Sequence, residues 1–168
     1  MTVDRLAQTP LALERLIAGR EAVALARRPE PKSWSATEIL CHLRDVEELF
    51  QIRFHTILAL DEPTILVLGA RPEDFVPWRF GLRHPLDPEV WAEERQYGRA
   101  DPREAFAAFQ RRRAEVLTLL RGLSESEWQR GGIHLARGRL TLAQWAASLA
   151  GHDDNHLAQL ERALEGLA

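Results

Sequence analysis

Two histidines near the C-terminus, His152 and His156, are four residues apart in a stretch with helical periodicity. On a helix this spacing places both imidazoles on one face, with Cβ atoms roughly 5–6 Å apart. Two imidazoles in this arrangement can chelate one metal ion at about 2.0–2.1 Å per nitrogen. The pair also continues an apolar stripe formed by Trp145, Leu149 and Leu160. We therefore expect both rings to face the protein interior, where unsatisfied ring nitrogens are costly.

A third histidine, His42, lies between Ile39 and Val46 at the edge of a second apolar stripe. If the two helices face each other, His42 can supply a third ligand. Three neutral imidazoles would leave one coordination position for water or substrate, the pattern of catalytic rather than structural zinc. Alternatively, the pair at 152 and 156 arises by chance and is exposed. The residue after the first histidine is Asp153 rather than glutamate, so this is not the zinc-protease motif.

Four long helices are predicted to position these residues, because apolar residues recur at helical spacing after four clear start signals. These signals are Thr9-Pro10, Ser35-Ala36-Thr37-Glu38, Asp101-Pro102 and Thr141-Leu142-Ala143-Gln144. The first helix is expected to end near Arg27, the second near Leu60 and the third at Gly122. A short helical turn is expected to lead to Trp128.

Residues 61–100 interrupt this pattern with five prolines and three glycines. Loops and short helices are expected there, including one from Pro88 to Tyr97 after an Asp87 cap. A connection of this length is uncommon unless it covers a site or an interface. With no convincing strands, the sequence predicts an all-α four-helix bundle with a long irregular connection between helices 2 and 3, forming a single domain over residues 1–168.

The composition narrows the classes of function. The chain has 168 residues and a net charge of −3, which argues against a general nucleic-acid or membrane-surface binder. No apolar run approaches the roughly 20 residues of a membrane span, and the N-terminus does not resemble a signal peptide. Cys41 is the only cysteine, so a reducing, cytoplasmic setting is expected.

Two stretches of this sequence resemble the DinB/YfiT-like family. Residues 34–43, Trp-Ser-Ala-Thr-Glu-Ile-Leu-Cys-His-Leu, are similar to that family's second-helix motif. Residues 138–145, followed by the stretch from His152 to Leu160, are similar to its last helix. The resemblance covers both ends of the bundle in the correct order, whereas residues 61–100 match no pattern of the family.

This resemblance implies a four-helix bundle with a metal site at His42, His152 and His156, and a homodimer. It implies one divalent metal ion; zinc or nickel is favoured, and iron or manganese would also suit imidazole ligands. The implied function is a metal-dependent enzyme, either a hydrolase or a transferase that uses a low-molecular-weight thiol such as bacillithiol or mycothiol. The alternative is a non-catalytic, stress-related protein that binds a metal or a small molecule. No catalytic base is identified.

Metal-bound histidines usually donate their second N–H to a carboxylate, a carbonyl or water. Asp45 and Glu38 are candidates beside His42, although the capping box competes for Glu38, and Gln159 is a candidate beside His156. Asp153 and Asn155 are predicted to point away, toward solvent or a dimer partner.

Several other residues are assigned structural roles. His55 is expected on the surface or in packing, His84 in a loop, and His134 in a structural role near the last helix. Cys41 is expected to be a small buried residue rather than a ligand. Core positions are expected for most of the tryptophans, with Trp34 as a hydrophobic staple and Trp78 and Trp91 lining a pocket or an interface. The run Arg111-Arg112-Arg113 is interpreted as a solvated helix face.

Overall fold

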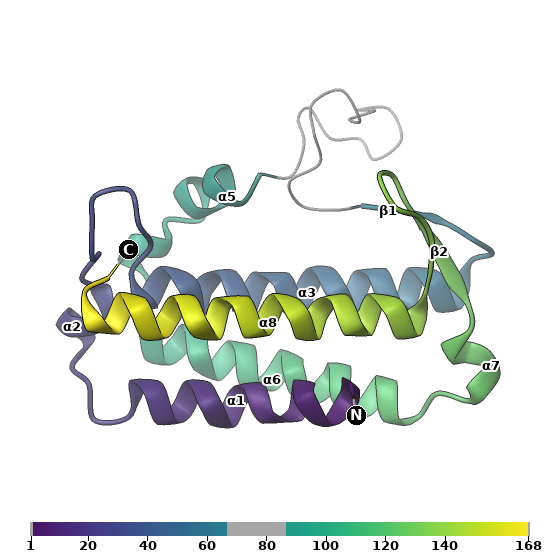
Figure 1. Cartoon of the computed structure of the whole chain (residues 1–168), viewed down its shortest axis with the longest axis horizontal. Coiled ribbons are helices and arrows are strands. Elements are labelled where there is room, and N and C mark those ends of the chain that lie inside the picture. The colour runs from purple at the N-terminus through teal and green to yellow at the C-terminus, as the bar shows by residue number, and fades with distance from the viewer. Residues whose placement is uncertain (1, 67–86, 168) are drawn as a thin grey trace.

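The computed structural model describes residues 2–66 and 87–167. Four long helices form the body of the protein: α1 (Thr2–Ile17), α3 (Ala36–Ala59), α6 (Pro102–Arg121) and α8 (Leu142–Glu165). Each contacts two others, so that α3 and α8 form one layer and α1 and α6 the second (Figure 1). The prediction of an all-α four-helix bundle is confirmed. None of the described helices is long and apolar enough to cross a membrane.

The chain directions explain the long connection after α3. Helices α3 and α6 are neighbours that run the same way, as are α1 and α8 (Figure 1). With 24 residues, α3 is roughly 36 Å long, so the chain must return along the whole bundle before α6 begins. Within this return lie the short α5 (Pro88–Glu94), which begins at the predicted Asp87 cap, and the 3-10 turn η2 (Tyr97–Arg99).

The predicted start signals hold for three of the four long helices. Ser35 and Thr141 each form a complete capping box, and Asp101 accepts from two backbone N–H groups at the start of α6. These contacts satisfy donors that a helix start otherwise leaves unpaired. The predicted short helix is α7 (Glu125–Trp128), capped by Ser124.

The first helix differs from its prediction at both ends. It begins at Thr2, with Pro10 inside it, and ends at Ile17 before Gly19, which has a φ of +70°. The separate helix α2 (Ala22–Ala26) follows. A proline inside a helix leaves the carbonyl four residues earlier without its donor. Here Nη1 of Arg113 donates to the Leu6 carbonyl at 2.8 Å, which replaces the missing bond.

A small sheet was not predicted. It joins β1 (Thr64–Ile65), β2 (Gly131–His134) and β3 (Gly138–Thr141), with β1 parallel and β3 antiparallel to β2. Strands of two and four residues carry too little alternation to be recognised in a sequence. The β2–β3 hairpin leads directly into α8 (Leu142–Glu165), because Thr141 is both the last residue of β3 and the N-cap of the helix.

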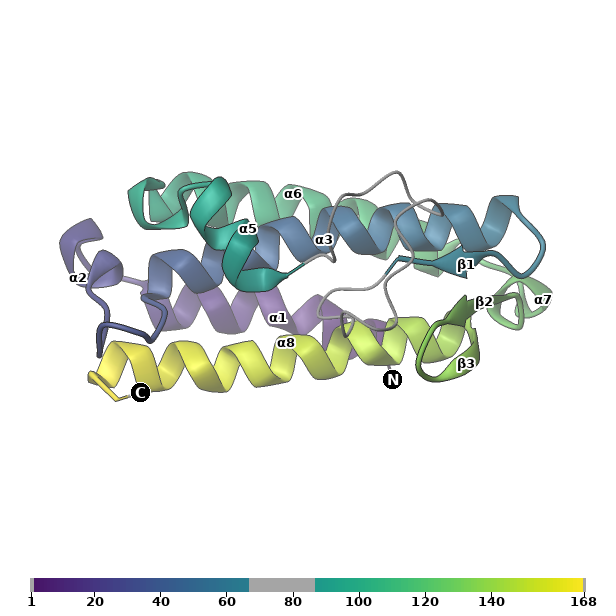
Figure 2. The ribbon, with the colours of Figure 1, turned by 90° about the horizontal axis from the view of Figure 1, so that it is seen from above.

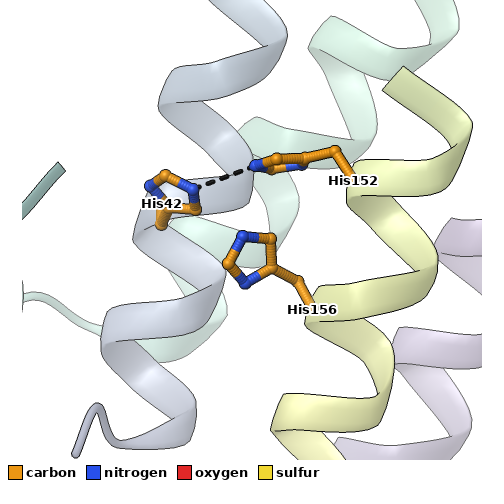
Figure 3. A group of neighbouring side chains, drawn as sticks. All are labelled: His42, His152 and His156. Carbon is orange, nitrogen blue, oxygen red and sulfur yellow. Dashed lines mark hydrogen bonds between the residues drawn. The ribbon is translucent and has the colours of Figure 1, made fainter. Parts of the chain in front are cut away.

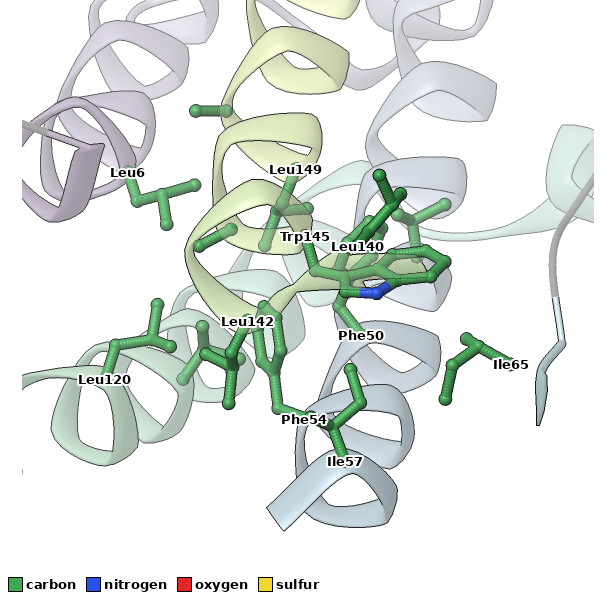
Figure 4. Packing of buried hydrophobic residues seen from close by; sticks show 14 residues of the cluster. Leu6, Phe50, Phe54, Ile57, Ile65, Leu120, Leu140, Leu142, Trp145 and Leu149 are labelled. Carbon is green, nitrogen blue, oxygen red and sulfur yellow. The ribbon is translucent and has the colours of Figure 1, made fainter. Parts of the chain in front are cut away.

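Two hydrophobic clusters fill the bundle, one at each end. Figure 4 shows the first, which is built around Trp145 and Phe54. The second contains Trp34, Tyr97 and Phe109. On α6 the buried Arg113 separates Phe109 of one cluster from Val116 of the other. The two clusters are thus divided by a polar layer, and the histidines border this layer.

Candidate metal centre

The three predicted histidines lie together between α3 and α8 (Figure 3). One ligand atom from each of His42, His152 and His156 can be chosen so that all lie within 4.8 Å of one another. The Nε2 atoms of His42 and His152 are 3.0 Å apart. Seen from above, α3 and α8 run side by side (Figure 2). Residues of both apolar stripes, among them Val46 and Leu149, belong to one buried cluster.

Burial keeps two of these imidazoles neutral. His42 is 3% exposed. Burial lowers its pKa to about 2, helped by the neighbouring His156 and His152. Burial also lowers the pKa of His156 to about 4, with a further contribution from His152. Neutral imidazoles are the form that binds metal ions.

The ring of His156 is oriented by Gln159. Its Nδ1 lies 2.7 Å from Oε1 of Gln159. Because an amide oxygen can only accept, Nδ1 carries the proton and Nε2 keeps its lone pair. The predicted supporting role of Gln159 is consistent with this contact.

The carboxylates expected beside His42 have other partners. Asp45 accepts from Oη of Tyr97 at 2.8 Å and pairs with arginines, among them Arg95 at 2.9 Å. Glu38 is held by the capping box and by Arg28. Within residues 2–66 and 87–167, Nδ1 of His42 has no hydrogen-bond partner. The prediction that Asp45 or Glu38 supports His42 is therefore wrong.

Asp153 and Arg113 are buried, contrary to the prediction of solvated positions. Asp153 is 1% and Arg113 0% exposed. Arg113 donates to both oxygens of Glu47 and, from Nη1, to Oδ2 of Asp153 at 2.7 Å. Thr9 donates to the same Oδ2 at 2.8 Å. These four residues, one from each long helix, are called the buried ion cluster below.

Burial and ion pairing have opposite effects on the pKa values of the two carboxyl groups in this cluster. Burial by itself raises the pKa of Asp153, but His152, Arg113 and Thr9 favour its ionised form and hold the pKa below its ordinary value. For Glu47 burial dominates and raises the pKa, although Arg113 opposes it. A signal for this cluster was present in the sequence, because Arg113 falls four residues after Phe109 and three before Val116, on the apolar stripe.

The remaining single-residue predictions agree with the structure wherever the residue is described. Cys41 is buried, and burial raises the pKa of its thiol to about 11, so it remains protonated. His55 is exposed, as is Asn155. His134 stacks on Trp145 with ring centroids 5.5 Å apart, which agrees with a structural role. His84 and Trp78 lie outside the described residues.

Trp34 is part of the site. Its ring lies 5.0 Å from that of His42 and stacks at 6.5 Å on that of His156. Its Nε1 donates to Glu89 of α5 at 3.1 Å. The hydrophobic staple predicted for Trp34 did not anticipate these contacts, because they depend on the packing of α8 and α5 against α3.

A pocket of about 490 Å³ opens over the histidines. This volume suits a small-molecule ligand. Its lining joins the loop before α3, the start of α5 and the end of α8, with Lys32, Trp34, Glu89, Gln159 and Arg162 beside the three histidines. The site can therefore bring a small molecule against three imidazoles.

Comparison with known proteins agrees with this architecture. The family model described as the DinB superfamily matches residues 5–160. Among solved structures, the chain is similar to YfiT from Bacillus subtilis, described as a probable metal-dependent hydrolase with an unusual four-helix bundle topology. The TM-score is 0.78 at 21% identity, covering 99% of this chain and 87% of that one. No curated protein matches in sequence. The chain belongs to the DinB superfamily.

Proposed function

We propose that this protein binds one divalent metal ion through His42, His152 and His156, and that it is a metal-dependent hydrolase of a small molecule. The observation that carries the proposal is the convergence of three imidazoles, with ligand atoms within 4.8 Å, in a pocket. The description of YfiT as a probable metal-dependent hydrolase also supports this proposal.

The donor set fits a divalent metal. Placing three imidazoles together in the interior is unfavourable unless their nitrogens gain partners. Nε2 of His42 and Nε2 of His152 lie 3.0 Å apart, and a cation bound there would give both lone pairs a partner. Three neutral nitrogen ligands suit zinc, nickel or iron. Zinc or nickel is our preferred ion.

A metal held by three histidines keeps an open position, where it can lower the pKa of a water or polarise a carbonyl or phosphoryl oxygen. Other residues of the pocket would shape it and orient the ligands. Trp34 forms a wall against two of the imidazoles, and Gln159 fixes the ring of His156. Lys32 and Arg162 place positive charge in the pocket lining. The carboxylate of Glu89 accepts a hydrogen bond from the indole N–H of Trp34.

The metal site is tested by the metal content of the purified protein and of single histidine variants. We expect about one ion per chain in the wild type and large losses in His42→Ala, His152→Ala and His156→Ala. His55→Ala is the matched control, because it removes an exposed histidine from the same helix as His42. Near-stoichiometric metal in the three site variants would overturn the three-histidine site.

The reaction is tested with protein reconstituted separately with zinc, nickel, iron and manganese. Ester, amide and phosphoester substrates probe hydrolysis, and electrophiles offered with a low-molecular-weight thiol probe transfer. We expect hydrolysis that requires metal and disappears in His42→Ala but not in His55→Ala. Activity that requires the thiol would replace the hydrolase with a transferase, and inactivity of the fully loaded protein would favour a binding role.

A further inference from the structure

Asp153 lies between the two helix α8 ligands in sequence but points into the bundle rather than to solvent. Its Oδ2 accepts from Oγ1 of Thr9 and Nη1 of Arg113. Two donors on one oxygen fix the orientation of the carboxylate. The second oxygen, Oδ1, is therefore left for another partner.

That second oxygen faces His152. Oδ1 of Asp153 lies 4.0 Å from Nδ1 of His152, which is longer than a hydrogen bond but within reach of a small rotation of the imidazole. Nδ1 of His152 is buried and has no hydrogen-bond partner among the described residues. On the opposite side of the ring, Nε2 faces Nε2 of His42. The imidazole of His152 thus lies between a fixed carboxylate and the metal centre.

We infer that Asp153 is a positioning residue for the metal site, which keeps the proton of His152 on Nδ1 and so leaves the Nε2 lone pair for the ion. This inference rests on the proposed metal site. Metal-bound histidines commonly donate their second N–H to a carboxylate, which fixes the tautomer and raises the basicity of the ligand. The buried ion cluster supplies that carboxylate from within the bundle.

The alternative role for Asp153 is purely structural, as a counter-ion of Arg113. That role explains the contacts of Oδ2, but it gives no function to Oδ1. This oxygen lies 4.0 Å from an imidazole nitrogen that has no hydrogen-bond partner in the described part of the chain. The two roles differ in what they predict for an isosteric amide.

In Asp153→Asn, the amide oxygen is expected to stay with Thr9 and Arg113, since both are donors. The NH₂ group then faces Nδ1 of His152. Because an NH₂ group can only donate, Nδ1 must accept, and the proton moves to Nε2. The wrong tautomer then opposes metal binding, whereas a purely structural Asp153 would leave the tautomer unchanged.

The test compares Asp153→Asn with Asp154→Asn, which changes the adjacent carboxylate, 57% exposed and paired with Arg5. Zinc affinity is measured by competition with a chromophoric chelator, and the His152 tautomer by ¹⁵N NMR of the metal-free protein. We expect Asp153→Asn to weaken zinc binding about 10- to 100-fold and to move the proton from Nδ1 to Nε2. Asp154→Asn is expected to match the wild type in both measurements.

Equal zinc affinity and an unchanged tautomer in Asp153→Asn would overturn the inference. If the wild type binds neither zinc nor nickel, or if His152→Ala does not reduce binding, the proposed metal site itself fails. If Asp153→Asn does not fold, Thr9→Val provides the test, because it removes one of the two donors to Oδ2. A folded Thr9→Val protein is expected to bind zinc roughly two- to tenfold more weakly, and wild-type affinity would contradict the inference.

Discussion

Replacing Arg113 with methionine should destabilise the bundle more than any exposed arginine variant. The guanidinium is 0% exposed and donates to Glu47, Asp153 and the Leu6 carbonyl. Methionine occupies a comparable volume but donates nothing. The variant therefore keeps two buried carboxylates and one carbonyl that have each lost their bond from Arg113, although Asp153 retains the donor Thr9.

The expected magnitude follows from these contacts. Removing one partner of a buried ion pair costs about 3–5 kcal/mol, because the opposite charge remains buried and unpaired. For a protein of this size, each kcal/mol lowers the melting temperature by roughly 2–4 °C. We therefore expect the melting temperature of Arg113→Met to fall by about 6–20 °C.

The assay is thermal and denaturant unfolding of the metal-free protein, with Arg111→Met as the matched control. Arg111 is exposed and lies two residues away on the same helix, so its replacement should change the free energy of unfolding by less than about 0.5 kcal/mol. Adding Glu47→Gln to Arg113→Met should recover part of the loss, because one buried charge is removed. A cost within about 1 kcal/mol of the control would refute the reasoning.

Three further predictions concern the histidine site and the sheet. Burial lowers the pKa of His42 in the folded, metal-free protein to about 2, against an ordinary 6.5. Below pH 6.5 the unfolded chain therefore takes up a proton at His42 that the folded protein does not. Stability is then lost at about 1.4 kcal/mol per pH unit as the pH falls, and denaturant unfolding of His42→Gln should show a shallower slope. Loading with paramagnetic Ni²⁺ or Co²⁺ should quench tryptophan emission, and Trp34→Phe should lose most of that quenching in a fluorescence titration. Gly132→Ala places a Cβ 2.6 Å from Ile65 and should cost about 1–3 kcal/mol by denaturant unfolding, whereas Gly151→Ala, in open space on a helix, should be neutral or stabilising.

The sequence by itself determined the features that depend on neighbours along the chain. The caps at Ser35, Asp101 and Thr141 begin helices as predicted, because capping contacts span only two or three residues. The spacing of His152 and His156 placed their rings on one face for the same reason. The family resemblance then correctly indicated the bundle.

Local sequence could not predict elements of secondary structure that depend on contacts with residues far away in the chain. Pro10 was predicted to begin a helix, and it lies inside one because Arg113 donates to the carbonyl that proline leaves unpaired. The sheet escaped prediction because its short strands are defined by pairing between residues as far apart as Thr64 and Ile133.

The candidate metal centre depends on both local sequence and tertiary packing. Helical spacing predicted that His152 and His156 lie on one face of a helix. Only the packing of α3 against α8 brings the Nε2 of His42 to 3.0 Å from that of His152. Asp153 looked like a solvated residue because helical geometry turns it away from its neighbours. The tertiary structure buries it instead, since Thr9 and Arg113 from two other helices supply the hydrogen bonds that a buried carboxylate requires.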